Sequence, residues 1–176
     1  MPNFTSSPKK MQILDCIKKR RSIRNYTSQE IPETAIKQIL EAGMNAPSAR
    51  NLQPREFALI TDKQLLEKLS QIKTHAHMVK ESNITIVVWM HNASNFYQQE
   101  VGACMQNMML TATALGIGSC RIGINAEQES QIRSLLNVPR NLHIPCLLAL
   151  GYPNEEKDSN NNFLKEKIHE NWWQTS

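Results

Sequence analysis

Ile84-Thr85-Ile86-Val87-Val88-Trp89-Met90 is the stretch around which the rest of the fold can be arranged. β-Branched side chains favour extended backbone, and a continuous apolar run of this length is typical of a strand covered on both faces. Pro145–Tyr152 has the same character, Phe57–Ile60 is a shorter apolar strand, and Gly118–Ile124 is a short extended segment with two glycines. These segments predict a central sheet.

Segments with helical apolar spacing alternate with these strands. Pro32 suits the first position of a helix, Asp62 is a predicted N-cap, and Asn125 with Gln128 resembles a capping box. The expected helices cover Met11–Arg20, Pro32 to Gly43, Asp62 through Ile72, Val101–Leu115, and Asn125 through Leu136.

The helix Val101–Leu115 is apolar over much of its circumference, which favours burial in the core or at a subunit interface. Gly116 is expected to end it. The mixture of helices and few strands predicts an α/β or α+β class, with one layer of sheet covered by helices.

The chain length of 176 residues predicts a single domain, 1–176, with a flexible N-terminus at 1–10 and a C-terminal extension at 154–176. The four cysteines are scattered, which predicts small buried side chains in a reducing compartment. No apolar run is long enough for a membrane span, and the N-terminus lacks the apolar core of a signal peptide. We therefore expect a cytoplasmic protein with no membrane partner.

The net charge of +4 is mild, and its basic residues cluster around Lys18–Arg24. Zinc-finger spacing and an aromatic ribonucleoprotein motif are both lacking, so nucleic acid is not an expected partner. An anionic small molecule fits a local basic cluster better, although a solvated surface explains it too. His75-x-His77 has no neighbouring carboxylate or cysteine, so no metal site is expected there.

The cluster Arg20-Arg21-Ser22-Ile23-Arg24 puts three guanidinium groups and a hydroxyl within five residues. An arginine offers a planar fork that matches phosphate oxygens, so a turn here could converge several donors on one anion. The alternative is a solvated basic helix end that the helix dipole favours.

The loop Pro47-Ser48-Ala49-Arg50-Asn51-Leu52-Gln53-Pro54 carries amide side chains between two stiffening prolines. Asn51 and Gln53 offer paired donors and acceptors, which suit a flat ring whose edge alternates the same groups. The alternative is that these amides satisfy the loop's own backbone.

Gly116-Ile117-Gly118-Ser119-Cys120-Arg121-Ile122-Gly123 is the third candidate segment. Glycine lets a backbone approach a ring system closely. The segment follows a helix and precedes a strand, so it is not a dinucleotide-binding fingerprint, and neither a Walker A pattern nor a nucleophile elbow is present.

The order of these motifs resembles the short, single-domain nitroreductases. The resemblance rests on R-R-S-I-R, A-P-S-A-x-N-x-Q-P, M-Q-N-M-M-L-T-A-T-A-L-G-I-G-S-C and L-A-L-G-Y-P, and it runs from about Ile13 to Trp172. It implies an α+β nitroreductase-like fold, with a central, mostly antiparallel sheet flanked by helices. It also implies an intertwined homodimer with FMN at the interface.

The resemblance assigns roles to particular residues. Arg20, Arg21, Ser22 and Arg24 would grip the FMN phosphate and ribityl chain, with Arg24 reaching the N1/O2 edge of the ring. The partner subunit would contribute Pro47, Ser48, Ala49, Asn51 and Gln53. Arg121, Ile122 and Gly123 would lie beside the ring with a backbone N–H at N5, and His75 near it. The family's C-terminal phosphate cation would be Lys165 or Lys167.

Two arginines depart from the family's pattern. Arg55 stands where many relatives carry Trp, and Arg121 where Trp or Pro is frequent. Both could enlarge the positive field over the substrate pocket.

The implied activity is an FMN-dependent oxidoreductase with no catalytic protein nucleophile, because the flavin carries the chemistry. NADH or NADPH would pass hydride to bound FMN, and a nitroaromatic, quinone or flavin-type acceptor would then take the electrons in a ping-pong scheme. The alternative is a non-catalytic flavin-binding or sensing protein on the same scaffold. A basic interaction protein is supported by the charge balance alone.

Overall fold

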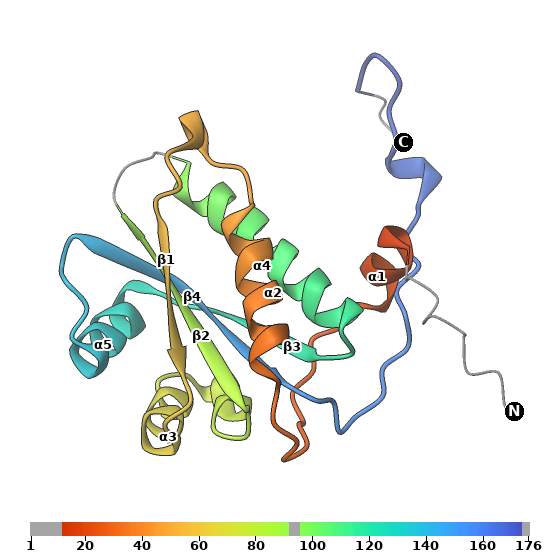
Figure 1. The fold of residues 1–176 in the computed structure, drawn as a ribbon. Helices are drawn as coiled ribbons and strands as arrows, with labels where there is room; N and C mark the ends of the chain where they lie inside the picture. The colour runs from red at the N-terminus through yellow and green to blue at the C-terminus, as the bar shows by residue number, and fades with distance from the viewer. Residues whose placement is uncertain (1–11, 92–95, 174–176) are drawn as a thin grey trace, which may run out of the picture.

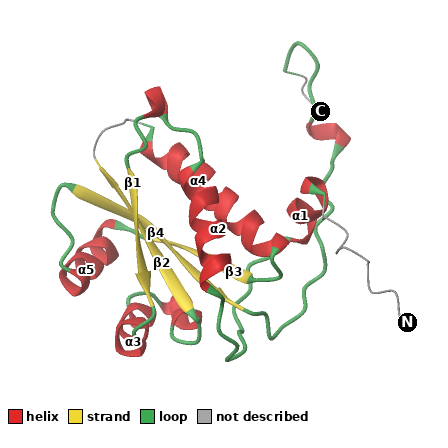
Figure 2. Ribbon diagram, viewed as in Figure 1, coloured by secondary structure: helices red, strands yellow, loops and turns green. Residues whose placement is uncertain are grey.

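Residues 12–91 and 96–173 are described by the computed structural model, so the expected flexible segment 1–10 lies outside the described residues. A four-stranded sheet in the order β1-β2-β4-β3 forms the centre, and each of its three pairings is antiparallel (Figures 1 and 2). The strands are β1 (Arg55–Ile60), β2 (Ile84–His91), β3 (Gly118–Gly123) and β4 (Leu142–Gly151).

Helices cover both faces of this sheet (Figure 1). They are α1 (Ile13–Lys19), α2 (Glu33–Met44), α3 (Lys63–Gln71), α4 (Tyr97–Ala114) and α5 (Ala126–Leu136), with three short 3-10 turns, η1 (Ala49–Asn51), η2 (Thr74–Val79) and η3 (Lys165–Lys167).

The core has two parts, one on each face of the sheet. On one face α2 and α4 pack against Ile86, Val88 and Leu148. On the other face α3, η2 and α5 pack against Val87 and Leu147. Neighbouring residues of β2 and β4 thus enter opposite cores, which explains why both strands are continuous apolar runs rather than alternating ones.

The expected caps are confirmed. Asp62 accepts a hydrogen bond from the Leu65 N–H (2.9 Å), and Asn125 and Gln128 form a reciprocal capping box with bonds of 2.9 and 3.0 Å. Pro32 is the N-cap of α2 rather than its first residue. β4 begins at Leu142, three residues before the expected Pro145, because pairing with β2 extends it.

The chain before α2 and the chain after β4 lie together at the β3 edge. Ser22 forms a parallel bridge with Ser119 of β3, and Tyr26 an antiparallel bridge with Pro153. After β4 the chain passes α1, where the Asn160 N–H donates to the Lys18 carbonyl (2.8 Å), and continues as a projecting arm (Figure 1).

Candidate functional site

The basic cluster Arg20–Arg24 leaves α1 and runs along the free edge of β3. The Ile23 N–H donates to the Ser119 carbonyl (3.0 Å), and the Ile23 side chain is buried. A Cβ on Gly118 would lie 2.9 Å from Ile23 Cβ, so this close approach requires glycine. The cluster is therefore anchored to the sheet and is not a freely solvated helix end.

The charges of three cations and of one carboxylate, Glu155, act on the Cys120 thiol. Burial raises the pKa of this thiol, while the charges of Arg24, Lys157 and Arg20 oppose that rise. Lys157 Nζ donates to the Ser22 carbonyl (2.6 Å), which fixes the ammonium group against the cluster. Lys157 was missed from the sequence because it is a single lysine in a polar loop, far from the cluster along the chain.

Arg21 lies beside two hollows at this edge of the sheet. It lines a small hollow with Lys19, Thr113 and Ser119, and it donates to the Asp158 carbonyl. The Ser119 hydroxyl in this hollow is buried without a partner among the described residues. Arg21 also lines a second hollow, of about 450 Å³, with Lys157, so it stays beside the lysine that contacts the basic cluster.

Glu155 ties the post-β4 segment to the basic cluster. Its carboxylate accepts from the N–H groups of Arg24 and Asn25 and lies 3.2 Å from Lys157 Nζ. Partial burial acts to raise the pKa of Glu155, but these hydrogen bonds and the lysine charge outweigh it and hold the pKa below its usual value.

Glu155→Gln is expected to lower the free energy of unfolding at pH 7 by about 1 kcal/mol. Because the folded-state pKa is depressed, this stabilisation is present above the unfolded-state value of about 4.3 and is lost as pH falls through the folded-state pKa. Urea unfolding at pH 7 and pH 3 measures the free energy of unfolding of wild type and variant, with Glu156→Gln as the matched control. If wild type and Glu155→Gln differ in free energy of unfolding by the same amount at both pH values, the Glu155 carboxylate does not stabilise the fold as described.

A hollow of about 540 Å³ opens at the other end of β3. Arg121 and Gly123 line it from β3, Tyr97 and His143 form another part of its wall with rings stacked at 5.3 Å, and Lys73 completes it. Lys73 Nζ donates to the Gly123 carbonyl (2.9 Å). The hollow therefore combines exposed strand backbone with two cations and one carboxylate, Glu129.

Of the residues expected beside the flavin ring, some line this hollow and others do not. Arg121 is exposed, whereas the Ile122 side chain is buried, so only its backbone can reach a ligand. His75 is exposed in η2 and does not line the hollow; Lys73, two residues earlier, does. No spacing in the sequence distinguishes Lys73 from other surface lysines.

The loop at residues 46–54 lies elsewhere, between α2 and β1. Its Ala49 N–H donates to Glu100 in the first turn of α4 (2.8 Å). Asn51 and Gln53 are exposed and bonded to each other (2.8 Å), and the Gln53 N–H donates to the Ser48 hydroxyl (3.0 Å). Within the described residues, the loop lines neither of the hollows beside β3.

The expectation that Arg55 adds positive charge over a substrate pocket is wrong. Its side chain is buried and turns back onto the loop, where it donates to the carbonyls of Ala46 and Pro47. The reason is local: both carbonyls lie within nine positions of Arg55, and a guanidinium group can reach several acceptors at once.

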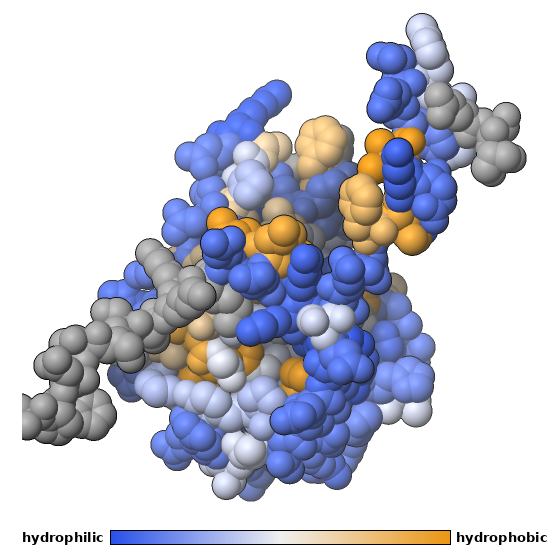
Figure 3. All heavy atoms as spheres, turned by 90° about the vertical axis from the view of Figure 1, so that its right-hand side faces the viewer, coloured by the Kyte–Doolittle hydropathy of each residue, from blue (hydrophilic) through white to orange (hydrophobic). Residues whose placement is uncertain are grey.

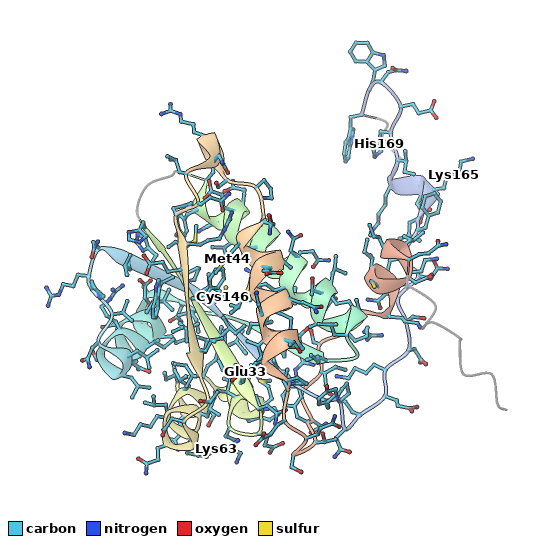
Figure 4. All side chains as sticks on the ribbon, viewed as in Figure 1. Glu33, Met44, Lys63, Cys146, Lys165 and His169 are labelled. Carbon is cyan, nitrogen blue, oxygen red and sulfur yellow. The ribbon has the colours of Figure 1, made fainter. Side chains whose placement is uncertain are left out.

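Lys165 and Lys167 belong to η3, and both are exposed. Figure 4 labels Lys165 on the projecting arm. Lys157, and not this pair, donates to the basic cluster among the described residues.

A second large hollow, of about 770 Å³, lies near the start of α2. Three glutamates and two lysines line it, so its charge does not favour a dianionic phosphate. The β3 edge is the better candidate for an anionic ligand.

Other chemistries find little support. All four cysteines are free and buried, and burial raises the pKa of Cys104 to about 11 and of Cys146 to about 12, which keeps both thiols neutral. Within residues 12–91 and 96–173, no group of three metal-binding side chains occurs. Over the same ranges, every helix is too short or too polar to cross a bilayer.

A family model described as "Putative TM nitroreductase" matches residues 12–175. The chain belongs to the nitroreductase family. A protein of Archaeoglobus fulgidus named "Putative NADH dehydrogenase/NAD(P)H nitroreductase" is 35% identical over 172 residues, which cover 92% of this chain and 99% of that protein.

Solved structures of similar proteins agree with this nitroreductase assignment. An FMN-dependent nitroreductase from Clostridium difficile has a TM-score of 0.87 at 30% identity, covering 91% of this chain and 99% of that one. A structure described as "a putative nitroreductase in complex with fmn", from Desulfovibrio desulfuricans, has a TM-score of 0.79 at 32% identity, covering 97% and 100%. The predicted α+β nitroreductase fold is confirmed.

Proposed function

We propose that this nitroreductase is an FMN-dependent enzyme that takes reducing equivalents from NADH or NADPH. Its acceptor is a nitroaromatic, quinone or flavin-type molecule, reduced in a ping-pong scheme. One observation carries the proposal: the basic cluster and Lys157 lie together beside the start of β3, and a hollow opens at its end. Because the cysteines are free and buried, we assign the enzyme to the reducing cytoplasm.

The residues along β3 fit FMN. A strand rises about 3.4 Å per residue, so Ser119 and Gly123 lie roughly 14 Å apart. An elongated ligand with a phosphate at one end and a ring at the other matches that arrangement. Arg20, Arg24 and Lys157 supply charge-assisted donors for the phosphate, and the Gly123 region accepts the flat ring.

When bound, FMN supplies the hydride and electron transfers of the reaction. The chain contributes binding, orientation and charge. Arg121 and Lys73 put positive charge at the hollow, which favours negative charge on a bound ring. The hollow remains open to solvent on one side, where NAD(P)H and the acceptor can alternate.

We propose a homodimer because the two halves of the site lie apart within one chain. The 46–54 loop contacts Glu100, in the first turn of α4, whereas Arg21 shares a hollow with Thr113, near the end of α4. With a rise of about 1.5 Å per residue, these points are roughly 20 Å apart along the helix. A two-fold axis that sets two α4 helices antiparallel brings one subunit's loop to the other's basic cluster.

Exposed apolar side chains agree with such an assembly. Eight of the twelve exposed large apolar side chains among the described residues lie on α1 and on the projecting arm, and Figure 3 shows apolar patches on this side of the molecule. The eight are Ile13, Leu14, Ile17, Phe163, Leu164, Ile168, Trp172 and Trp173. Large apolar patches of this kind mark interaction surfaces.

The visible absorption spectrum of the purified protein tests the function. We expect flavin absorbance after incubation with FMN and gel filtration, anaerobic bleaching by NADH or NADPH, and recovery when a quinone or nitroaromatic is added. A protein that retains no FMN contradicts the flavin assignment. Retained flavin that neither nucleotide bleaches contradicts the enzymatic assignment and favours a sensing role.

A further inference from the structure

The 46–54 loop has a backbone shape that its own sequence does not favour. Arg50, Asn51 and Gln53 have φ values of 53°, 55° and 49°. Non-glycine residues enter this left-handed region rarely and at a cost in free energy, so the conformation persists only where surrounding contacts determine it.

Two buried charged side chains supply such contacts from outside the loop. Glu100 is 5% exposed, and its Oε1 accepts from the Ala49 N–H at 2.8 Å. Arg55 is 7% exposed and donates to the Ala46 carbonyl, the Pro47 carbonyl (3.4 Å) and Gln53 Oε1 (2.5 Å).

The chemistry of the two side chains is complementary. The cation satisfies the loop's acceptors, and the anion satisfies a loop donor. Burying a charge is costly, and Glu100 Oε2 and Arg55 Nε have no partner within the described part of the chain. An apolar pair could fill the same space at lower cost but could not fix the loop's polar groups.

We infer that Arg55 and Glu100 are positioning residues that hold the 46–54 loop in the shape in which it completes the partner subunit's flavin site. This inference rests on the proposed function, because it takes the loop as part of that site. It accounts for an arginine at position 55, where the family resemblance leads one to expect an aromatic residue.

Three variants distinguish a role of Arg55 and Glu100 in positioning the loop from a role in packing alone. Glu100→Leu and Arg55→Met remove the polar contacts at similar volume, and each is expected to weaken FMN binding about tenfold, the typical effect of losing one charge-assisted hydrogen bond. Glu100→Gln keeps an acceptor for the Ala49 N–H and should restore affinity to within about threefold of wild type. Fluorescence titration measures the affinities, with Glu127→Leu and Arg140→Met as matched surface controls.

Hydrogen exchange of the apo protein gives a readout that does not depend on flavin. Amides of residues 46–54 should exchange about tenfold faster in Arg55→Met and Glu100→Leu, and close to the wild-type rate in Glu100→Gln. Arg55→Lys, which keeps the charge but not the fork, should be intermediate and serves if Arg55→Met does not fold.

The outcomes distinguish the two claims. Wild type that binds no FMN overturns the proposed function. Wild type that binds FMN, with variants of equal affinity and unchanged loop exchange, overturns the positioning role alone. A lowered melting temperature of the variants with unchanged FMN affinity also overturns it, since that is the signature of packing.

Discussion

Arg20→Ala combined with Arg24→Ala is expected to weaken FMN binding by roughly a hundredfold or more, since each charge-assisted hydrogen bond contributes about 1.5–3 kcal/mol. Both guanidinium charges act on the Cys120 thiol, and among the described residues Lys157 and Arg21, which line one hollow, would remain near the cluster for a phosphate. The protein should therefore elute from gel filtration without flavin absorbance, and titration should show the loss of affinity directly.

The control for this experiment is Arg140→Ala. Arg140 is exposed in the turn before β4, and its loss changes the net charge without touching the β3 edge. FMN affinity of that variant should match wild type. If the double variant retains FMN as wild type does, the basic cluster is not the phosphate site.

Those parts of the fold that depend on neighbouring residues were predictable. β2 and β4 are confirmed because a β-branched or apolar run needs little tertiary information to be recognised as a buried strand. The caps at Asp62 and Asn125 are confirmed because a side chain bonds a backbone N–H three residues away. In both cases the decisive interaction lies within a few residues.

The parts that depend on distant pairing were not predictable. Lys157 contacts Ser22 across 135 positions, and Lys73 contacts Gly123 across 50. Neither lysine has a local pattern that separates it from a surface lysine. Burial of Arg55 was missed for another reason: its acceptors are nearby backbone carbonyls of Ala46 and Pro47, and no side-chain pattern in the sequence identifies them.

Family resemblance placed the 46–54 loop and the basic cluster in one site, and the fold of a single chain keeps them at opposite ends of α4. The two statements agree if the site is shared between subunits. That condition makes the proposed dimer a requirement of the chemistry rather than a separate property, so an experiment on assembly can test the site itself.

Mixing two inactive variants is expected to restore activity. Arg20→Ala/Arg24→Ala lacks the basic cluster, and Asn51→Ala/Gln53→Ala lacks the amides of the loop, so each homodimer has two defective sites. In a heterodimer one site combines the intact basic cluster of one subunit with the intact loop of the other. Random exchange makes about half of the dimers heterodimers, each with one intact site of two, so roughly a quarter of wild-type FMN sites and NAD(P)H oxidation should return.

The alternative geometry gives the opposite result, which makes the mixture decisive. If each subunit bound FMN with its own cluster and its own loop, every chain in the mixture would carry one defect, and activity would stay at the level of the separate variants. Co-expression with two affinity tags isolates the heterodimer, whose flavin content should be about one per dimer because only one of its two symmetric sites is intact. A heterodimer without flavin would refute the shared site even if the chain is dimeric.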